Sequence, residues 1–259
     1  MAAVARCGDT VHTMLLLEAP ELWLIGAIFA GAGLVKGMLG MGLPTFAMGF
    51  LGLWMPVPQA AALLTLPALV TNLWQAFSGG ALRVLWPRIG MLQLGIAAGV
   101  AGAAWLLPAG GRGSHGLLGA CLLLYGAVGL VGWRTRAPGP RLQRVAAPLV
   151  GLATGVVTAL TGVFVLPLVP YLQALQLDRH QLTQALGVSF TTSTIALAAM
   201  LAWQGHLDLS GTLHSALSLV PALAGMLVGQ KLRDAMSEAL FSRCFFAALV
   251  LLGVWLVVR

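Results

Sequence analysis

The sequence contains few charged residues and very few acidic ones. Only 8% of the 259 residues are charged, whereas 59% are hydrophobic. About a quarter of the residues in a soluble domain are charged, so a soluble fold is excluded. The acidic residues all lie in the N-terminal segment or in expected loops: Asp9, Glu18, Glu21, Asp178, Asp208, Asp234 and Glu238. We therefore expect an all-α, polytopic membrane protein.

Cysteine is equally scarce, which limits the chemistry that the chain can support. Cys7, Cys121 and Cys244 are far apart, form no CxxC pair and have no histidine at metal-binding spacing. Neither a disulfide framework nor a metal site is indicated, and no cofactor is expected. The net charge of +7 is compatible with nucleic-acid binding, but the arginines cluster between apolar runs, as topology signals do. The expected partner is a lipid bilayer, not a nucleic acid.

Long apolar runs dominate the rest of the sequence. A helix needs about 20 residues to cross about 30 Å of hydrocarbon. Eight runs meet this length, at residues 22–50, 59–78, 88–107, 116–133, 146–172, 181–203, 209–230 and 239–258. Almost all of the eight tryptophans fall near the ends of these runs, as interfacial aromatic residues do. For Trp74 alone, stacking on a substrate is a competing interpretation.

The first and fifth runs are nearly 30 residues long and contain clusters of glycine, so we expect each to be a helix broken near its middle. Pro44 and Pro167 follow the two glycine clusters and are 123 residues apart. This spacing predicts an internal duplication of four segments. The predicted parts are an N-terminal tail (1–21), a first repeat (22–133), an arginine-rich cytoplasmic linker (134–144) and a second repeat (145–259).

The positive charges leave two orientations open. Short cytoplasmic loops are rich in Lys and Arg, which places the linker arginines inside. If the first and fifth runs cross the membrane, both termini share the cytoplasmic side. If these runs dip in and return as hairpins, both termini lie outside and further basic loops join the linker inside: those with Arg83, Arg88, Arg179, Lys231 and Arg233. We favour the hairpin form, which gives the stronger charge bias and inverted repeats.

Lys36 is the main candidate for a substrate-binding residue. It lies within the apolar run 22–50, and an ionisable residue at membrane depth indicates a functional site. Gly37, Gly40 and Gly42 follow it and would let backbone N–H groups approach an anion at a helix break. The alternatives are that Lys36 extends to the membrane surface and that these glycines serve close helix packing.

Uncharged polar side chains are the other candidates for substrate binding. Asn72 and Gln75 share one helical face, with Thr65 two turns earlier, and their donors suit a sulfonate or carboxylate. The second half offers an equivalent set: Thr161, Ser189, Thr192 and Ser193. Hydrogen bonds between helices, or to the backbone of the same helix, are the alternative roles of these residues.

Four segments carry a resemblance to a known family: GLVKGMLGMGLP (33–44), QAAALLTLPALVTNLWQAFSGG (59–80), GVVTALTGVFVLPLVPYL (155–172) and QALGVSFTTS (184–193). They resemble the TauE/SafE family of sulfite and organosulfonate exporters over about residues 22–258. The resemblance implies a multi-pass permease of the bacterial inner membrane that exports a small sulfur-containing or carboxylated anion. In the second copy, Thr161-Gly162-Val163-Phe164 replaces the expected glycine cluster, which argues against a symmetrical two-motif site.

Two other classes of function remain as alternatives. One is a structural or assembly subunit without transport activity. The other is an intramembrane serine hydrolase that uses Ser189 and His214, although GVSF (187–190) lacks the second glycine of the GxSG pattern. We expect a transporter with no catalytic residues, and a homodimer is the default assembly.

Overall fold

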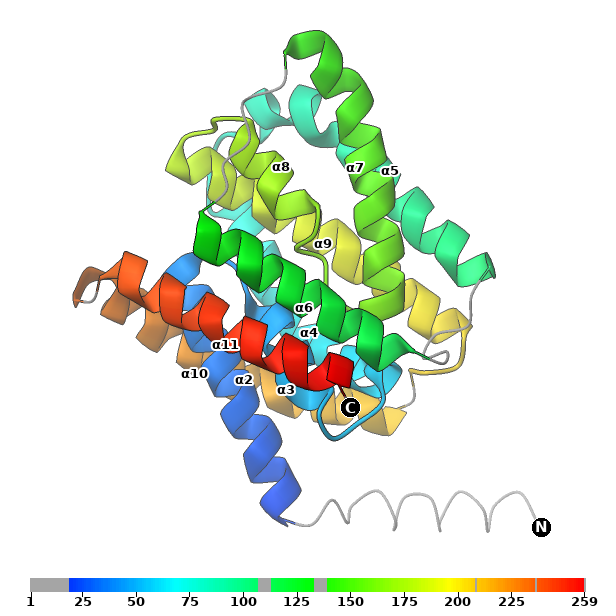
Figure 1. The fold of residues 1–259 in the computed structure, drawn as a ribbon, viewed down its shortest axis with the longest axis vertical. Coiled ribbons are helices and arrows are strands. Elements are labelled where there is room, and N and C mark those ends of the chain that lie inside the picture. The colour runs from blue at the N-terminus through cyan, green and yellow to red at the C-terminus, as the bar shows by residue number, and fades with distance from the viewer. Residues whose placement is uncertain (1–18, 107–112, 133–138, 208, 236, 259) are drawn as a thin grey trace.

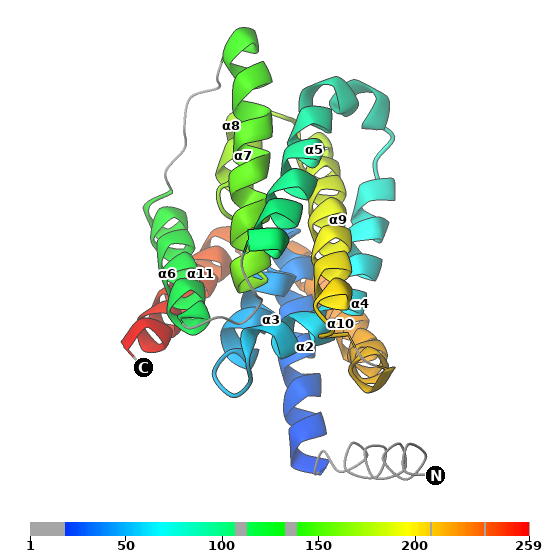
Figure 2. The same cartoon turned by 90° about the vertical axis from the view of Figure 1, so that its right-hand side faces the viewer.

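A computed structural model describes residues 19–106, 113–132, 139–207, 209–235 and 237–258. These residues form ten α-helices and no strand (Figures 1 and 2). The helices are α2 (Ala19–Leu39), α3 (Leu43–Leu51), α4 (Val57–Phe77), α5 (Leu82–Leu106), α6 (Ser114–Val131), α7 (Pro140–Thr161), α8 (Leu168–Ala174), α9 (Arg179–Trp203), α10 (Leu209–Ala235) and α11 (Glu238–Val258).

Eight of these helices are long and apolar enough to cross a membrane, and they coincide with the eight predicted runs. The all-α, multi-span prediction is confirmed. Two starts were predicted too late: α5 begins at Leu82 rather than 88, and α7 begins at Pro140 rather than 146. The first turns of both helices contain arginines. These charges end the apolar run in the sequence, but the helix itself continues through them. Helix α7 therefore takes up the last part of the predicted linker.

Both predicted breaks are present, and each lies a few residues past the middle of its run, at the last glycines of the cluster. Helix α2 ends at Leu39, and Gly40 and Gly42 adopt positive φ angles of 73° and 99° before α3 begins. Helix α7 ends at Thr161, its C-cap Gly162 has a φ of 69°, and residues 163–167 lead to α8. Such angles favour glycine. Each long helix is thus followed by a short helix. Whether the two broken runs form hairpins in the membrane stays a prediction.

The helices pack in pairs. Helix α5 lies along α7 and α2 lies along α10, each pair parallel, while α6 and α11 are antiparallel neighbours (Figures 1 and 2). Helices α4 and α9 pack against each other in antiparallel directions, and α10 and α5 each contact this central pair. The same pairings result when α2, α4, α5 and α6 are exchanged, in this order, with α7, α9, α10 and α11. For example, the pair α2 and α10 then becomes the pair α7 and α5. The internal duplication itself stays a prediction.

Glycine permits the closest of these contacts. A Cβ at Gly33 would lie 2.0 Å from the carbonyl oxygen of Ala222 on α10, so the two backbones touch. Gly151 and Gly155, which belong to the glycine cluster of the fifth run, do not break the helix and pack against the backbone of α5. Small residues let membrane helices approach in this way.

Gly33→Val should reduce the yield of folded protein because the side chain would drive α2 away from α10. Overpacking of this kind costs about 1–3 kcal/mol. Gly26→Val on the same helix is the matched control, because a Cβ there meets nothing within 4 Å. Size-exclusion chromatography of detergent-solubilised fusions to a fluorescent protein measures the monodisperse fraction. An equal monodisperse fraction for the two variants would contradict the packing argument.

Helix α4 carries several polar candidates and is shaped by Pro67. Because Pro67 has no N–H, the carbonyl of Leu63 lacks its usual partner in the helix. Ser215 of α10 donates a hydrogen bond to that carbonyl at 2.7 Å and accepts one from Leu66 N–H at 3.1 Å. A side chain from a neighbouring helix thus restores the backbone hydrogen bonding that a proline disrupts inside a membrane.

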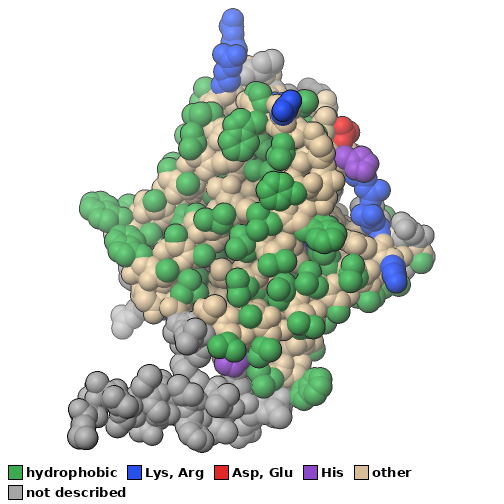
Figure 3. Space-filling model, turned by 180° about the vertical axis from the view of Figure 1, so that it is seen from behind, with side chains coloured by type: hydrophobic (Ala, Val, Ile, Leu, Met, Phe, Trp, Pro, Cys, Tyr) green, Lys and Arg blue, Asp and Glu red, His purple; other side chains and the backbone are tan. Residues whose placement is uncertain are grey.

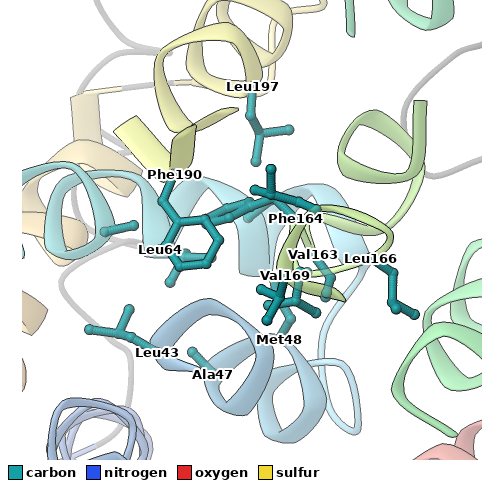
Figure 4. Packing of buried hydrophobic residues seen from close by; sticks show 14 of the residues in the cluster. Leu43, Ala47, Met48, Leu64, Val163, Phe164, Leu166, Val169, Phe190 and Leu197 are labelled. Atoms are coloured by element: carbon teal, nitrogen blue, oxygen red, sulfur yellow. The ribbon is translucent and has the colours of Figure 1, made fainter. Parts of the chain in front are cut away.

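The two broken runs meet in the apolar centre of the molecule. Figure 4 shows Met48 of α3 close to Val163 and Phe164, which follow the end of α7, and Phe190 of α9 beside Phe164. Met48, Phe164 and Phe190 are fully buried, and the two phenylalanine rings lie 5.2 Å apart. Met48, Phe164 and Phe190 are called the central apolar cluster below.

Basic side chains gather at one end of the bundle, where α6 ends and α7 begins (Figure 3). Apart from Lys36, every Lys and Arg whose side chain the structure describes lies there: Arg83, Arg88, Arg141, Arg144, Arg179, Lys231, Arg233 and Arg243. The start of α2 and the end of α11 lie at the opposite end, since α2 is parallel to α10 and α11 is antiparallel to α6. The first of these ends is called the basic end below.

Candidate functional site

Lys36 forms the centre of a buried polar cluster. It lies in the last turn of α2 and is 4% exposed. Its ammonium group donates a hydrogen bond to Oδ1 of Asn72 on α4. The amide nitrogen of Asn72 in turn donates to Thr194 Oγ1 on α9 at 3.3 Å. Three helices therefore join at one cation, and Lys36 does not extend to the membrane surface.

Gln75 fixes the first break to both halves of the chain. Its Nε2 donates to the carbonyl of Gly40 at 2.8 Å and to the carbonyl of Thr183 at 3.0 Å. Its Oε1 is buried and has no hydrogen-bond partner. An unsatisfied buried acceptor costs about 1–3 kcal/mol. Gln75 therefore holds the end of α2 in place from α4, one turn beyond Asn72.

Further buried polar atoms of the described residues have no partner. These are Thr45 Oγ1, Gln93 Oε1 and Ser193 Oγ. Gln93 of α5 also donates to Ser189 of α9 at 2.9 Å. Buried polar groups are usually satisfied, so unpartnered groups in the protein interior are compatible with a site that a polar ligand completes.

Helix α3 directs its N-terminus towards the first break. Gly42 is its N-cap, and Pro44 lies in its first turn. The first N–H groups of a helix have no partner within it and carry partial positive charge. Thr45, whose buried hydroxyl is unpartnered, lies in the same turn. The turn therefore offers neutral donors to an anion near the end of α2.

Several predicted site residues have structural partners. Gly37 packs against the backbone of α10, where a Cβ would lie 2.2 Å from the Met226 carbonyl oxygen. Thr65 donates to Ala61, Thr161 to Val157 and Thr192 to Val188, each to a carbonyl of its own helix. Thr161 Oγ1 also accepts from Val163 N–H at 3.2 Å and so supports the second break. These contacts match the alternative roles that the sequence left open.

Three buried polar residues were missed from the sequence: Gln93, Thr194 and Thr45. A signal existed for Thr194, which lies 122 residues after Asn72, close to the spacing of Pro44 and Pro167. Gln93 carried no such signal, because one amide in a long apolar helix resembles packing. Trp74 is 65% exposed, which favours a position on the outer surface over stacking on a substrate.

A cavity of about 580 Å³ lies beside the first break. Leu39 and Met41, which flank Gly40, form one part of its wall. The remaining lining comes from α6, α8, the start of α9 and α11: Tyr125, Val128, Gly129, Gly132, Val169, Pro170, Gln173, Gln176, Leu177, Leu182, Ser242 and Phe246. Gly132 and Gln176 are exposed, so the cavity is accessible at the basic end.

The arrangement is suited to binding an anion. Lys36 is the single charged side chain among the buried residues that the structure describes, and its neighbours are neutral amides and hydroxyls. The described part of the chain contains no cluster of His, Cys, Asp or Glu that could hold a metal ion. The hydroxyl of Ser189 accepts a hydrogen bond from the Gln93 amide, and an amide cannot act as a general base.

Comparison with protein families gives one match over nearly the whole chain. The family described as "Sulfite exporter TauE/SafE" matches residues 24–256. No curated protein and no solved structure matches the chain significantly. The match includes both broken runs and all of the polar cluster.

Proposed function

Because the chain belongs to the TauE/SafE family of sulfite exporters and is a multi-pass membrane transporter of the sulfite and organosulfonate type, we propose that it exports a small anion through a site between its two halves. The site comprises Lys36, the amides of Asn72 and Gln75, and the first turn of α3. Sulfite, a small organosulfonate or a small carboxylate fits these donors.

The burial of Lys36 is the observation that supports this proposal most directly. A buried cation is costly unless it has a partner of opposite charge. Among the described residues its hydrogen-bond partner is the neutral Asn72, and no salt bridge forms. A bound anion would supply the missing negative charge. A purely structural or assembly role gives no reason to retain an uncompensated cation between α2 and α4.

The distribution of charge supports an orientation for the protein. Short cytoplasmic loops are rich in Lys and Arg, so the basic end faces the cytoplasm. The described chain then begins and ends outside, which is the hairpin topology favoured from the sequence. In a bacterial inner membrane, the inside-negative potential favours export by about 2.3 kcal/mol per negative charge per 100 mV. A uniporter needs no further energy source.

Counterflow into proteoliposomes tests the function directly. Vesicles preloaded with unlabelled sulfite, isethionate or acetate should accumulate the corresponding labelled anion in exchange. Protein-free vesicles should not accumulate it. Exchange of none of these anions would reject the proposed transport activity, and the all-helical fold would remain unaffected.

Asn72→Asp should reduce exchange more than Asn72→Leu does. A carboxylate at this position would pair with Lys36 and neutralise the positive charge that binds the substrate. Leucine has a similar size but leaves this positive charge available. We expect a difference of about tenfold, which corresponds to about 1.4 kcal/mol. Exchange rates at equal amounts of folded protein measure it. A leucine variant that is less active than the aspartate variant would contradict the proposed charge pairing.

A further inference from the structure

The cavity of about 580 Å³ at the basic end is not part of the polar cluster around Lys36. It lies between the end of α2 on one side and α8 with the start of α9 on the other. We infer that this cavity is the cytoplasmic vestibule through which the anion reaches Lys36, and that Met41, Tyr125 and Phe246 form a plug between the two. This inference rests on the proposed function and adds the access route to it.

Position is the first argument. Leu39 and Met41 line the cavity and flank Gly40, and Lys36 lies one turn before Gly40 on the same helix. The carbonyl of Gly40 faces Gln75, which belongs to the polar cluster. The first break therefore separates the cavity from the cluster, with one face towards each.

The plug consists of three side chains from separate parts of the chain. The hydroxyl of Tyr125 on α6 contacts the sulfur of Met41 at 3.4 Å. The ring of Tyr125 also packs edge-on against Phe246 of α11, with the ring centroids 5.3 Å apart. Methionine is flexible and its contacts are weak, so rotation of Met41 could open a path without unfolding a helix.

The chemistry of the wall suits a passing anion. Gln173, Gln176 and Ser242 present neutral hydrogen-bond donors, and none of the lining residues is acidic. Gln176 adopts a φ of 52° and is the one non-glycine residue with positive φ among the described residues. Strain of this kind is often retained at functional sites. Neutral donors bind an anion weakly enough to release it towards Lys36.

On the side of α3, dense apolar packing separates the site from the second break. The central apolar cluster of Met48, Phe164 and Phe190 is fully buried between α3, the second break and α9. An anion cannot pass through such packing without losing all of its hydrogen bonds. The cavity beside the first break is open at the basic end, as the loading state of an exporter requires.

Cysteine labelling tests the vestibule. In a chain whose Cys7, Cys121 and Cys244 are replaced by alanine, Gln173→Cys should react with a membrane-impermeant sulfonated maleimide from the cytoplasmic side. Isethionate should slow this reaction severalfold, and the attached group should block counterflow of isethionate. Trp54→Cys, 58% exposed in the loop between α3 and α4, is the control. It should react from the opposite side, without protection and with little loss of exchange.

The outcomes separate this inference from the proposed function. If the cysteine-free protein exchanges isethionate, but labelled Gln173→Cys remains active and isethionate gives no protection, the vestibule is rejected and the transport function stands. If the cysteine-free protein and its parent both fail to exchange any tested anion, the proposed function is rejected first. Labelling of Gln173→Cys from the same side as Trp54→Cys would also overturn the inference.

Discussion

Lys36→Met should lower anion exchange by about 100-fold or more. Methionine has a similar length and suits the buried, apolar surroundings of this position, so the fold should survive. Lys36 is the single charged side chain among the buried residues that the structure describes. In its absence, the substrate would enter the site without a partner of opposite charge. A loss of about 2.7 kcal/mol of binding corresponds to 100-fold, and an uncompensated buried charge costs several kcal/mol.

Lys36→Arg is the matched control for charge. It preserves the cation but replaces a compact ammonium with a planar guanidinium, which cannot reproduce the same contact with Asn72. We expect exchange between the levels of wild type and Lys36→Met, with equal amounts of monodisperse protein for all three. A Lys36→Met variant that exchanges isethionate at the wild-type rate would reject the site while leaving the family assignment intact.

The sequence was sufficient to predict the features that depend on composition. The eight apolar runs predict the eight helices that are long and apolar enough to cross a membrane. Seven tryptophans near the run ends are exposed, as residues at a membrane interface should be: Trp23, Trp54, Trp74, Trp86, Trp105, Trp203 and Trp255. The eighth, Trp133, lies outside the described residues. The lack of acidic residues within the runs likewise indicated that a buried charge would be positive.

The role of each glycine could not be predicted, because it depends on the partner helix. Gly37 and Gly40 are three residues apart in one motif, yet Gly37 touches the backbone of α10 whereas Gly40 ends α2. The motif predicts that small residues are needed but not which of them break the helix. The same holds for Gly155 and Gly162 in the second half, where only Gly162 adopts a positive φ.

The polar cluster shows the same limit of local patterns. Asn72 and Gln75 were predicted as one face of α4, and both do reach the first break. Their other partners, Thr194 and the Thr183 carbonyl, belong to the second half of the chain. Only the 122-residue separation between Asn72 and Thr194 connects such positions in the sequence. The partners of the remaining polar groups follow from helix packing alone.

A single buried cation should also select substrates by their charge. A monoanion neutralises Lys36, whereas a dianion brings one negative charge for which the described buried residues offer no partner. Because an unpaired buried charge costs several kcal/mol, we expect a preference for the monoanion of about 100-fold, equivalent to about 2.7 kcal/mol. Sulfoacetate and its primary amide form a suitable pair, since they are nearly isosteric and differ by one charge.

Competition against labelled isethionate in counterflow measures this selectivity, with the amide expected to inhibit at much lower concentration than sulfoacetate. Sulfite gives an independent check, because bisulfite loses its remaining proton near neutral pH. Exchange of sulfite should therefore fall as the pH rises and the dianion replaces the monoanion. Isethionate stays a monoanion throughout this range, so it separates the titration of the substrate from any titration of the protein. Equal inhibition by sulfoacetate and its amide would show that a second positive charge reaches the site.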